Sequence, residues 1–388
     1  MLLYVTAGEP QEREFRPLRT IPETLAGLYD LGMRQHIRRA VLLDCVDGEW
    51  REMPDWRLDR LVIRLAVHSR ERLDVIPGDR VAIFGPSSWL WPAVEFAAMG
   101  FGCVAVGLSH LLSDGELSAA LAESAPRVAF ATDIESARRL MQLRAAAALP
   151  ETVIVPDDLA ADGPGLLTLG RVLELASILD TPERAQNFRA CARGVSAETD
   201  ACWHFGRGEP EKGPSLVRLT HGQAMALVKK RLGQLPAARH DVAYLQAPEM
   251  TLAARIAYHA FVGDGCTTTA VGRSGVPDDL TLLRPHKAQV SAAWLTQTWA
   301  RIETSSESPL RSLSRRLPRQ RWLRALDLRG PWVRRAVRAS FGDRLRCLEV
   351  PGTIEPDAAD SLRRAGVAVV EVVTPDLEAA SMRRSLGP

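Results

Sequence analysis

Hydrophobic residues follow two patterns along this chain. Short apolar runs with β-branched residues, such as Arg80–Phe84 and Cys103–Leu108, predict buried strands. Between such runs, apolar positions recur at helical spacing, as in Ser113–Ser124. Ser113 followed by Glu116 predicts a capping box at the start of that helix. Strands that alternate with helices of this length predict a parallel sheet with helices on its faces.

The same alternation returns in the second half of the chain. Ala201–Phe205 and Ser215–Leu219 are predicted strands, and Thr220 is the predicted cap of a helix that runs through Leu232. We therefore expect an α/β protein with two subdomains, each with a mostly parallel sheet flanked by helices. The expected parts are an N-terminal extension (1–20), a first subdomain (21–150), a connecting region with one helix (151–199), and a second subdomain (200–388) with an arginine-rich insert (308–340).

The composition is that of an ordinary globular chain. Of 388 residues, 46% are hydrophobic and 25% charged, which is too apolar for extended disorder. The net charge of +2 does not favour nucleic acid as a partner. The six cysteines form no Cys-x-x-Cys pair, so neither a zinc site nor a redox motif is predicted. Residues 1–20 lack the apolar core of a signal peptide, so we expect a cytoplasmic protein.

One segment departs from this even distribution of charge. Residues 308–340 hold ten arginines and one acidic residue, a local charge of +9. The simpler interpretation is a pair of surface helices whose arginines face water. The alternative is attachment at the periphery of an anionic membrane, or to an acidic partner protein. The side chains expected to make that contact are Arg315, Arg316, Arg319, Arg321, Trp322 and Arg324.

Several motifs, taken in order, resemble a known family. Gly78–Phe84, Ser87–Gly100 and Gly102–Gly107 are similar to the N-terminal domain of the adenylate-forming acyl-CoA synthetase superfamily, except that Gly107 replaces a proline. Thr220-His221 resembles the end of that family's phosphate-binding motif. The arginine-rich insert looks most like that of long-chain fatty acyl-CoA synthetases. The resemblance implies two α/β subdomains and an enzyme that joins a carboxylate to AMP.

Adenylation needs small residues and hydrogen-bond donors around the phosphates of ATP, which the family supplies as Thr-Ser-Gly-Thr-Thr-Gly-x-Pro-Lys-Gly. The matching stretch here, Gly206–Ser215, contains no hydroxyl before its last residue. Glu209 and Glu211 would repel a polyphosphate, and Pro210 lacks an amide donor. We therefore predict a loop that does not cradle ATP. The residues that remain for an altered anion nest are Gly206, Arg207, Gly208 and Lys212.

The family's second motif, Tyr-Gly-x-Thr-Glu, is also altered. It should fall near Glu371, where this chain lacks the tyrosine and the glycine. Gly352, on the expected adenine side, and Thr374 are the remaining cofactor-binding candidates. Glu378 would bind a metal only if the protein is active. The family's C-terminal domain, which carries a catalytic lysine, is expected to be absent, because no lysine follows Lys287.

Because these determinants of ATP chemistry are altered together, the leading hypothesis is a degenerate, catalytically inactive relative of the family. It would have no catalytic residues, no metal site and no cofactor, and would act as a binding or scaffolding subunit for a partner enzyme or an acyl ligand. The alternative is a divergent ligase that uses a fatty acid, ATP and Mg²⁺ together with a separate lysine-bearing domain. A third class is a peripheral membrane adaptor that binds through residues 308–340.

Overall fold

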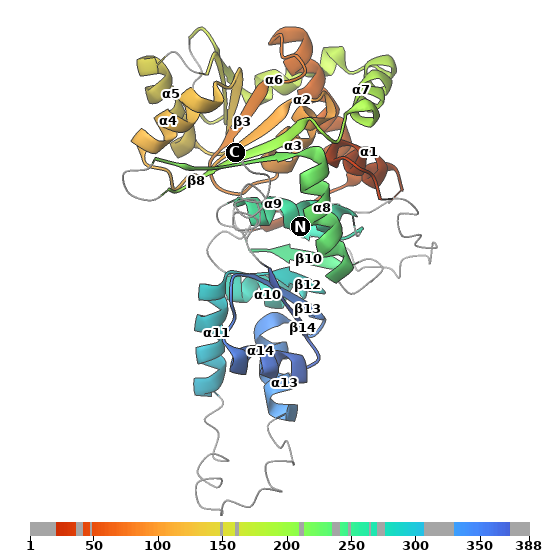
Figure 1. Cartoon of the computed structure of the whole chain (residues 1–388), viewed down its shortest axis with the longest axis vertical. Helices are drawn as coiled ribbons and strands as arrows, with labels where there is room; N and C mark the ends of the chain where they lie inside the picture. The colour runs from red at the N-terminus through yellow and green to blue at the C-terminus, as the bar shows by residue number, and fades with distance from the viewer. Residues whose placement is uncertain are drawn as a thin grey trace, which may run out of the picture.

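The structure is a computed structural model in which two sheets follow one another along the long axis of the molecule (Figure 1). Helices cover the faces of both sheets (Figure 1). The described residues are 21–35, 42–46, 49–147, 150–159, 163–208, 213–234, 241–246, 250–263, 265–269, 276–305 and 330–372.

The first sheet has seven strands. They are β3 (Arg80–Phe84), β4 (Val104–Leu108), β5 (Val128–Ala131), β6 (Thr152–Val155), β7 (Leu166–Thr168), β8 (Asp200–Gly206) and β9 (Ser215–Thr220). Their order is β7-β6-β5-β3-β4-β8-β9, and every pair is parallel except the β8–β9 hairpin. The helices before and between these strands are α1 (Leu25–Gln35), α2 (Asp55–Arg72), α3 (Leu90–Gly100), α4 (Asp114–Ser124), α5 (Ile134–Ala147), α6 (Leu169–Leu179) and α7 (Pro182–Gly194).

The second sheet also has seven strands. They are β1 (Leu42–Val46), β2 (Glu49–Met53), β10 (Val242–Leu245), β11 (Thr267–Thr269), β12 (Lys287–Gln289), β13 (Cys347–Pro351) and β14 (Ala368–Val372). Their order is β14-β13-β12-β10-β11-β1-β2, and every pair is parallel except the antiparallel pair of β1 and β2. The helices of this half are α8 (His221–Gln234), α9 (Leu252–Gly263), α10 (Val276–Leu283), α11 (Ala292–Ser305), α13 (Gly330–Phe341) and α14 (Pro356–Arg364).

The core is continuous between the two sheets. Helices α3 and α9 are buried at every position, as expected for helices that are packed on all sides. One cluster of buried apolar side chains draws on both halves, from Val81 and Ala105 in the first sheet to Ala243 and Cys347 in the second. The two halves therefore share one interior rather than meeting at a polar interface.

The expected α/β class, with two mostly parallel sheets flanked by helices, is confirmed. Strand β3 has the predicted bounds, and the capping box of α4 forms: Ser113 Oγ accepts from the Glu116 amide at 3.3 Å, and Glu116 Oε2 accepts from the Ser113 amide at 2.8 Å. Thr220 likewise caps α8, because its Oγ1 accepts from the Gln223 amide at 3.2 Å.

The subdomain boundary expected at residue 200 differs from the division of the strands. Strands β8 and β9 belong to the first sheet, where β8 pairs with β4, and β1 from the N-terminal part belongs to the second. Strand β4 is buried at all five positions, which requires a neighbour on each edge, and β8 supplies the second one.

The connecting region was expected to contain one helix but contains two, along with strands β6 and β7 of the first sheet. Pro182 lies in the first turn of helix α7, where its missing amide is not needed. The Thr181 hydroxyl caps the same helix by accepting from the Arg184 amide at 3.3 Å.

Candidate functional site

The expected phosphate loop joins the two strands of the β8–β9 hairpin. Strand β8 ends at Gly206 and β9 begins at Ser215, so the loop leaves the carboxyl end of a parallel strand. The end of β8 is joined to the segment after β4 by the Ser109 amide, which donates to the Phe205 carbonyl at 3.0 Å. Arg207, Gly208, Gly213 and Pro214 are described, whereas the predicted site residue Lys212 and its neighbours at 209–211 lie outside the described residues.

The two described ends of this loop touch each other through their backbones. A Cβ atom added to Gly208 would overlap the carbonyl oxygen of Gly213. Gly213 has a φ of +75°, in the left-handed region that favours glycine. Glycine at 208 therefore permits this close backbone approach.

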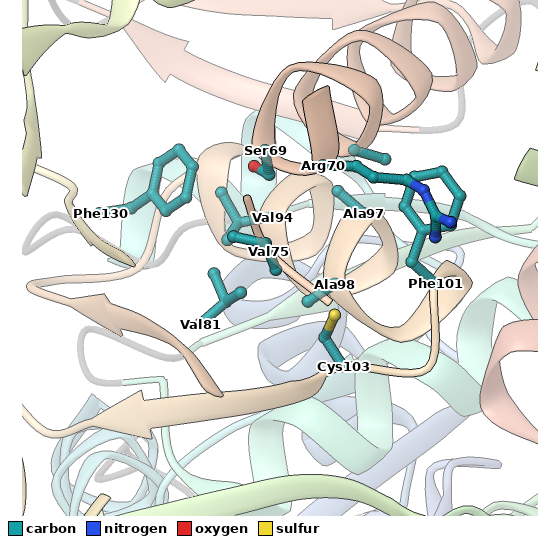
Figure 2. Close-up of a pocket in the computed structure, with 11 residues that line it drawn as sticks. Ser69, Arg70, Val75, Val81, Val94, Ala97, Ala98, Phe101, Cys103 and Phe130 are labelled. Atoms are coloured by element: carbon teal, nitrogen blue, oxygen red, sulfur yellow. The ribbon is translucent and has the colours of Figure 1, made fainter. Parts of the chain in front are cut away.

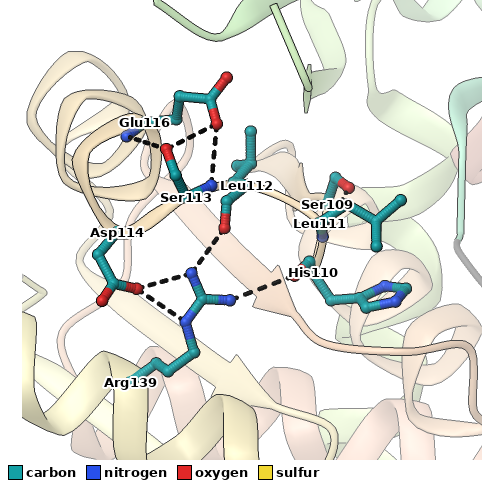
Figure 3. A network of polar contacts seen from close by, with 8 residues as sticks. All are labelled: Ser109, His110, Leu111, Leu112, Ser113, Asp114, Glu116 and Arg139. Carbon is teal, nitrogen blue, oxygen red and sulfur yellow. Dashed lines mark hydrogen bonds and ion pairs between the residues drawn. The ribbon is translucent and has the colours of Figure 1, made fainter.

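The Gly208 amide donates to a carboxylate of the chain itself. Its acceptor is Oε1 of Glu116, at 3.3 Å. The other carboxylate oxygen, Oε2, accepts from both the amide and the hydroxyl of Ser113 at 2.8 Å, as drawn in Figure 3. The hydrogen bonds from Ser113 lower the pKa of Glu116 most, and the Gly208 amide and Arg207 lower it further. Glu116 is therefore ionised at neutral pH.

Arg139 of α5 holds the segment that carries this carboxylate. Its guanidinium donates to the carbonyl oxygens of His110 at 3.2 Å and Leu112 at 2.6 Å (Figure 3). The same group binds Asp114 Oδ1, at 2.9 Å from Nε and 2.7 Å from Nη2. The segment between β4 and α4 is thus tied to α5, which fixes where Glu116 points.

One amide of the described part of the loop is already used. A polyphosphate needs free amide donors and positive charge, whereas the Gly208 amide donates to an ionised carboxylate. No group of three acidic, histidine or cysteine side chains within the described residues could hold a metal ion. The sequence-based alternative that depends on Mg²⁺ placed its ligand at Glu378, which is outside those residues.

Gly352 lies at the end of β13, in the second sheet. Its φ is +100°, and its amide donates to the Val372 carbonyl at 3.0 Å, so its backbone contact is within that sheet. A cavity of about 10 Å³ lies nearby, lined by residues including Ile354 and Trp299, and it has room for roughly one water. It is too small for an adenine ring. Thr374 lies outside the described residues.

The predicted interaction surface is not described. Arg315, Arg316, Arg319, Arg321, Trp322 and Arg324 all lie in the segment 306–329, outside the described residues. Of the arginine-rich insert, only helix α13 is described. Among the described helices, none combines the length and apolarity that crossing a bilayer would require.

Sequence reasoning missed a buried ionic cluster where the two halves meet. Glu95 of α3 and Arg255 of α9 are each at most 2% exposed. Glu95 Oε1 accepts from Arg255 Nε at 3.0 Å and lies 2.8 Å from Arg255 Nη2 as an ion pair. Nε2 of His259 lies 3.4 Å from the same oxygen. Burial alone would raise the pKa of Glu95, but Arg255 and His259 outweigh it and lower that pKa to about 2. The available signal was a lone glutamate inside an otherwise apolar helix.

Arg255 also reaches two strands of the first sheet. Its Nη2 donates to the Ala105 carbonyl of β4 at 3.0 Å and its Nη1 to the Trp203 carbonyl of β8 at 2.8 Å. The guanidinium lies against Gly107, where a Cβ would come within 2.8 Å of Nη1. Gly107, which stands at the position of a family proline, therefore leaves the space that Arg255 fills.

The Gly107→Ala variant is expected to be destabilised by about 1–3 kcal/mol, as for other overpacked cores. The added methyl would lie 2.8 Å from Arg255 Nη1, 3.0 Å from His204 Nδ1 and 3.1 Å from Trp91 Cζ3. Urea unfolding checks the difference, with Gly115→Ala as the control, because nothing lies within 4 Å of a Cβ there. Equal stability of the two variants would contradict the proposed packing.

A second small cavity lies between α2 and α3 (Figure 2). It holds about 10 Å³, is lined mainly by apolar side chains, and is bordered by Arg70, whose guanidinium lies 5.0 Å from the centre of the Phe101 ring. The Cys103 thiol donates to the Ile76 carbonyl at 3.3 Å, and burial raises its pKa to about 12. A thiol with that pKa is not a nucleophile at neutral pH, so we do not assign a reaction to this cavity.

The comparisons with known proteins bear on the first part of the chain and on the fold. The family model described as AMP-binding enzyme matches residues 34–177. No curated protein matches the sequence. The predicted resemblance to the N-terminal domain of the adenylate-forming superfamily is confirmed by this match and by the solved structures that share the fold.

Three of these solved structures illustrate the similarity. A luciferase-like enzyme from the nonluminescent mealworm Zophobas morio has a TM-score of 0.65 at 14% identity, over 92% of this chain and 74% of that one. A benzoate CoA ligase from Burkholderia xenovorans LB400 has a TM-score of 0.62 at 17% identity, over 89% and 60%. A Mycobacterium tuberculosis fatty acyl CoA synthetase has a TM-score of 0.59 at 17% identity, over 89% and 58%. At these identities the likeness concerns the fold.

Proposed function

We propose that this chain is a degenerate acyl-CoA-synthetase-like protein that does not form acyl-adenylates and serves as a binding or scaffolding subunit. One observation carries the first part of the proposal: the Gly208 amide of the phosphate loop donates to Glu116. An ionised carboxylate at that amide repels the phosphates that the loop would otherwise hold. The loop sequence adds Glu209 and Glu211 to the same negative charge.

The interior supports the second part of the proposal. The core is continuous between the sheets. Arg255 donates hydrogen bonds to Glu95 of α3 and to carbonyl oxygens of strands β4 and β8. A well-packed frame beside a changed phosphate loop is expected when folding is retained for binding rather than for ATP chemistry. The partner we propose is a protein, such as an active enzyme of the same pathway, or an acyl ligand.

Catalysis is tested by ATP–pyrophosphate exchange with a panel of fatty acids. We expect no exchange above the protein-free blank, because the loop lacks a free amide nest for the phosphates. Exchange that is lost in Lys212→Ala but kept in Lys230→Ala would overturn the proposal. Exchange that arises only when a separate lysine-bearing domain is added would favour the divergent ligase.

Binding is tested by thermal unfolding with candidate ligands. A fatty acid that binds only the folded chain raises its Tm, and at about a hundredfold excess over Kd it stabilises by about 2.7 kcal/mol. We expect such a shift with an acyl ligand in the absence of ATP and no shift with ATP and Mg²⁺. A shift with ATP and Mg²⁺ alone would contradict the proposed loss of the nucleotide site.

A further inference from the structure

Glu116 makes two separate contacts with its two carboxylate oxygens. Oε2 completes the capping box with Ser113, which needs only one acceptor atom. Oε1 is directed at the Gly208 amide, 92 positions further along the chain. The second contact is not needed to start helix α4, so the capping role does not explain it.

The partner of Gly208 resembles an oxyanion in charge and in acceptor geometry. A backbone amide that donates to a carboxylate oxygen makes the same kind of charge-assisted hydrogen bond that it would make to a phosphate oxygen. Glu116 is ionised because Ser113, Gly208 and Arg207 all lower its pKa. Arg207 thus contributes positive potential at the same place.

The carboxylate is held in position before any ligand arrives. The segment between β4 and α4 is tied to α5 by Arg139, and the Ser113 amide and hydroxyl orient Oε2 (Figure 3). A preorganised internal group competes strongly with an external one, because it loses little freedom when its hydrogen bond forms.

We propose that Glu116 is an autoinhibitory contact: its carboxylate occupies the Gly208 amide and keeps external oxyanions from the Arg207–Gly208 turn. The inference rests on the proposed function, since it gives a cause for the loss of phosphate binding. Removal of the charge at Glu116 exposes a weak site for small oxyanions at this turn. Catalysis is not restored, because the other altered positions remain.

The test compares the full-length protein with Glu116→Gln by titration with inorganic pyrophosphate at constant ionic strength. Glutamine at this position keeps the capping box, so helix α4 should still form. The matched control is Glu123→Gln, which removes one charge from the exposed face of the same helix, where Glu123 pairs with Arg218. The readouts are calorimetry and the chemical shift of the Gly208 amide.

We expect Glu116→Gln to bind pyrophosphate about fivefold or more tightly than the wild type, with a shift of the Gly208 signal, because a like charge near the ligand is gone. The Glu123→Gln variant should bind as the wild type does. Equal affinity of all three proteins, or tighter binding in both variants, would overturn the inference. The proposed function is tested separately, by ATP–pyrophosphate exchange with the wild type. A failed titration therefore contradicts the role of Glu116 without contradicting the proposed function.

Discussion

Replacing Arg255 by methionine is expected to destabilise the folded chain by about 3–5 kcal/mol, because it leaves the Glu95 carboxylate buried without its counter-charge. Arg255 supplies the hydrogen bond and the close ion pair to Glu95 Oε1, and the carbonyls of Ala105 and Trp203 lose a donor as well. Urea denaturation followed by circular dichroism measures the loss as a change in midpoint at constant slope.

A double variant separates the ion pair from packing alone. In Glu95→Leu/Arg255→Met both charges are gone, and we expect most of the stability to return, since apolar replacements of buried ion pairs are often neutral or stabilising. Arg171→Met is the exposed control, because its pair with Glu174 lies in solvent and contributes about 0–1 kcal/mol. A double variant as unstable as the single one would contradict the electrostatic explanation.

Lowering the pH from about 7.5 to about 5 is expected to remove about 4 kcal/mol of folding stability, through two buried histidines. Burial lowers the pKa of His204 to about 3, assisted by Arg255, and burial lowers the pKa of His221 to about 4, assisted by His259. In the unfolded chain both rings take up protons near pH 6.5, whereas in the folded chain they stay neutral to lower pH. The contribution of these two histidines to folding stability is therefore fully present above pH 6.5 and is lost as the pH falls below it.

The histidine that is simplest to replace is His221, which is fully buried and whose ring nitrogens have no hydrogen-bond partner among the described residues. His221→Gln should remove about half of the pH dependence between these two pH values. Glu95 adds a second loss of folding stability at lower pH. This loss develops as the pH falls from the unfolded pKa of Glu95 to its folded pKa of about 2. His110→Gln, in the segment between β4 and α4, is the control. An unchanged pH slope in His221→Gln would contradict this account.

Local patterns were sufficient for some of the elements. The bounds of β3 and the capping box of α4 follow from residues that are close in the sequence, because backbone hydrogen bonds and caps are local interactions. The order of the family motifs also identified the class of fold. The connecting region has two helices where one was expected, and the second begins at Pro182, because a proline is tolerated in the first turn of a helix.

Contacts between distant residues were beyond sequence reasoning. Glu95 and Arg255 are 160 positions apart, and Gly208 and Glu116 are 92 apart. No spacing rule connects such residues, because their proximity depends on which strands are neighbours. Even the placement of β8 in the first sheet was missed, since its hydrophobic pattern fits either sheet.

Taken alone, the sequence determined the class of fold and the changed chemistry of the Gly206–Ser215 loop, because residue types and their spacing are local properties. Only the tertiary structure decided what the loop amide binds and where Arg255 finds its counter-charge. The physical reason is that a hydrogen bond or ion pair acts over a few ångströms in space, and chain folding, not sequence distance, sets that separation.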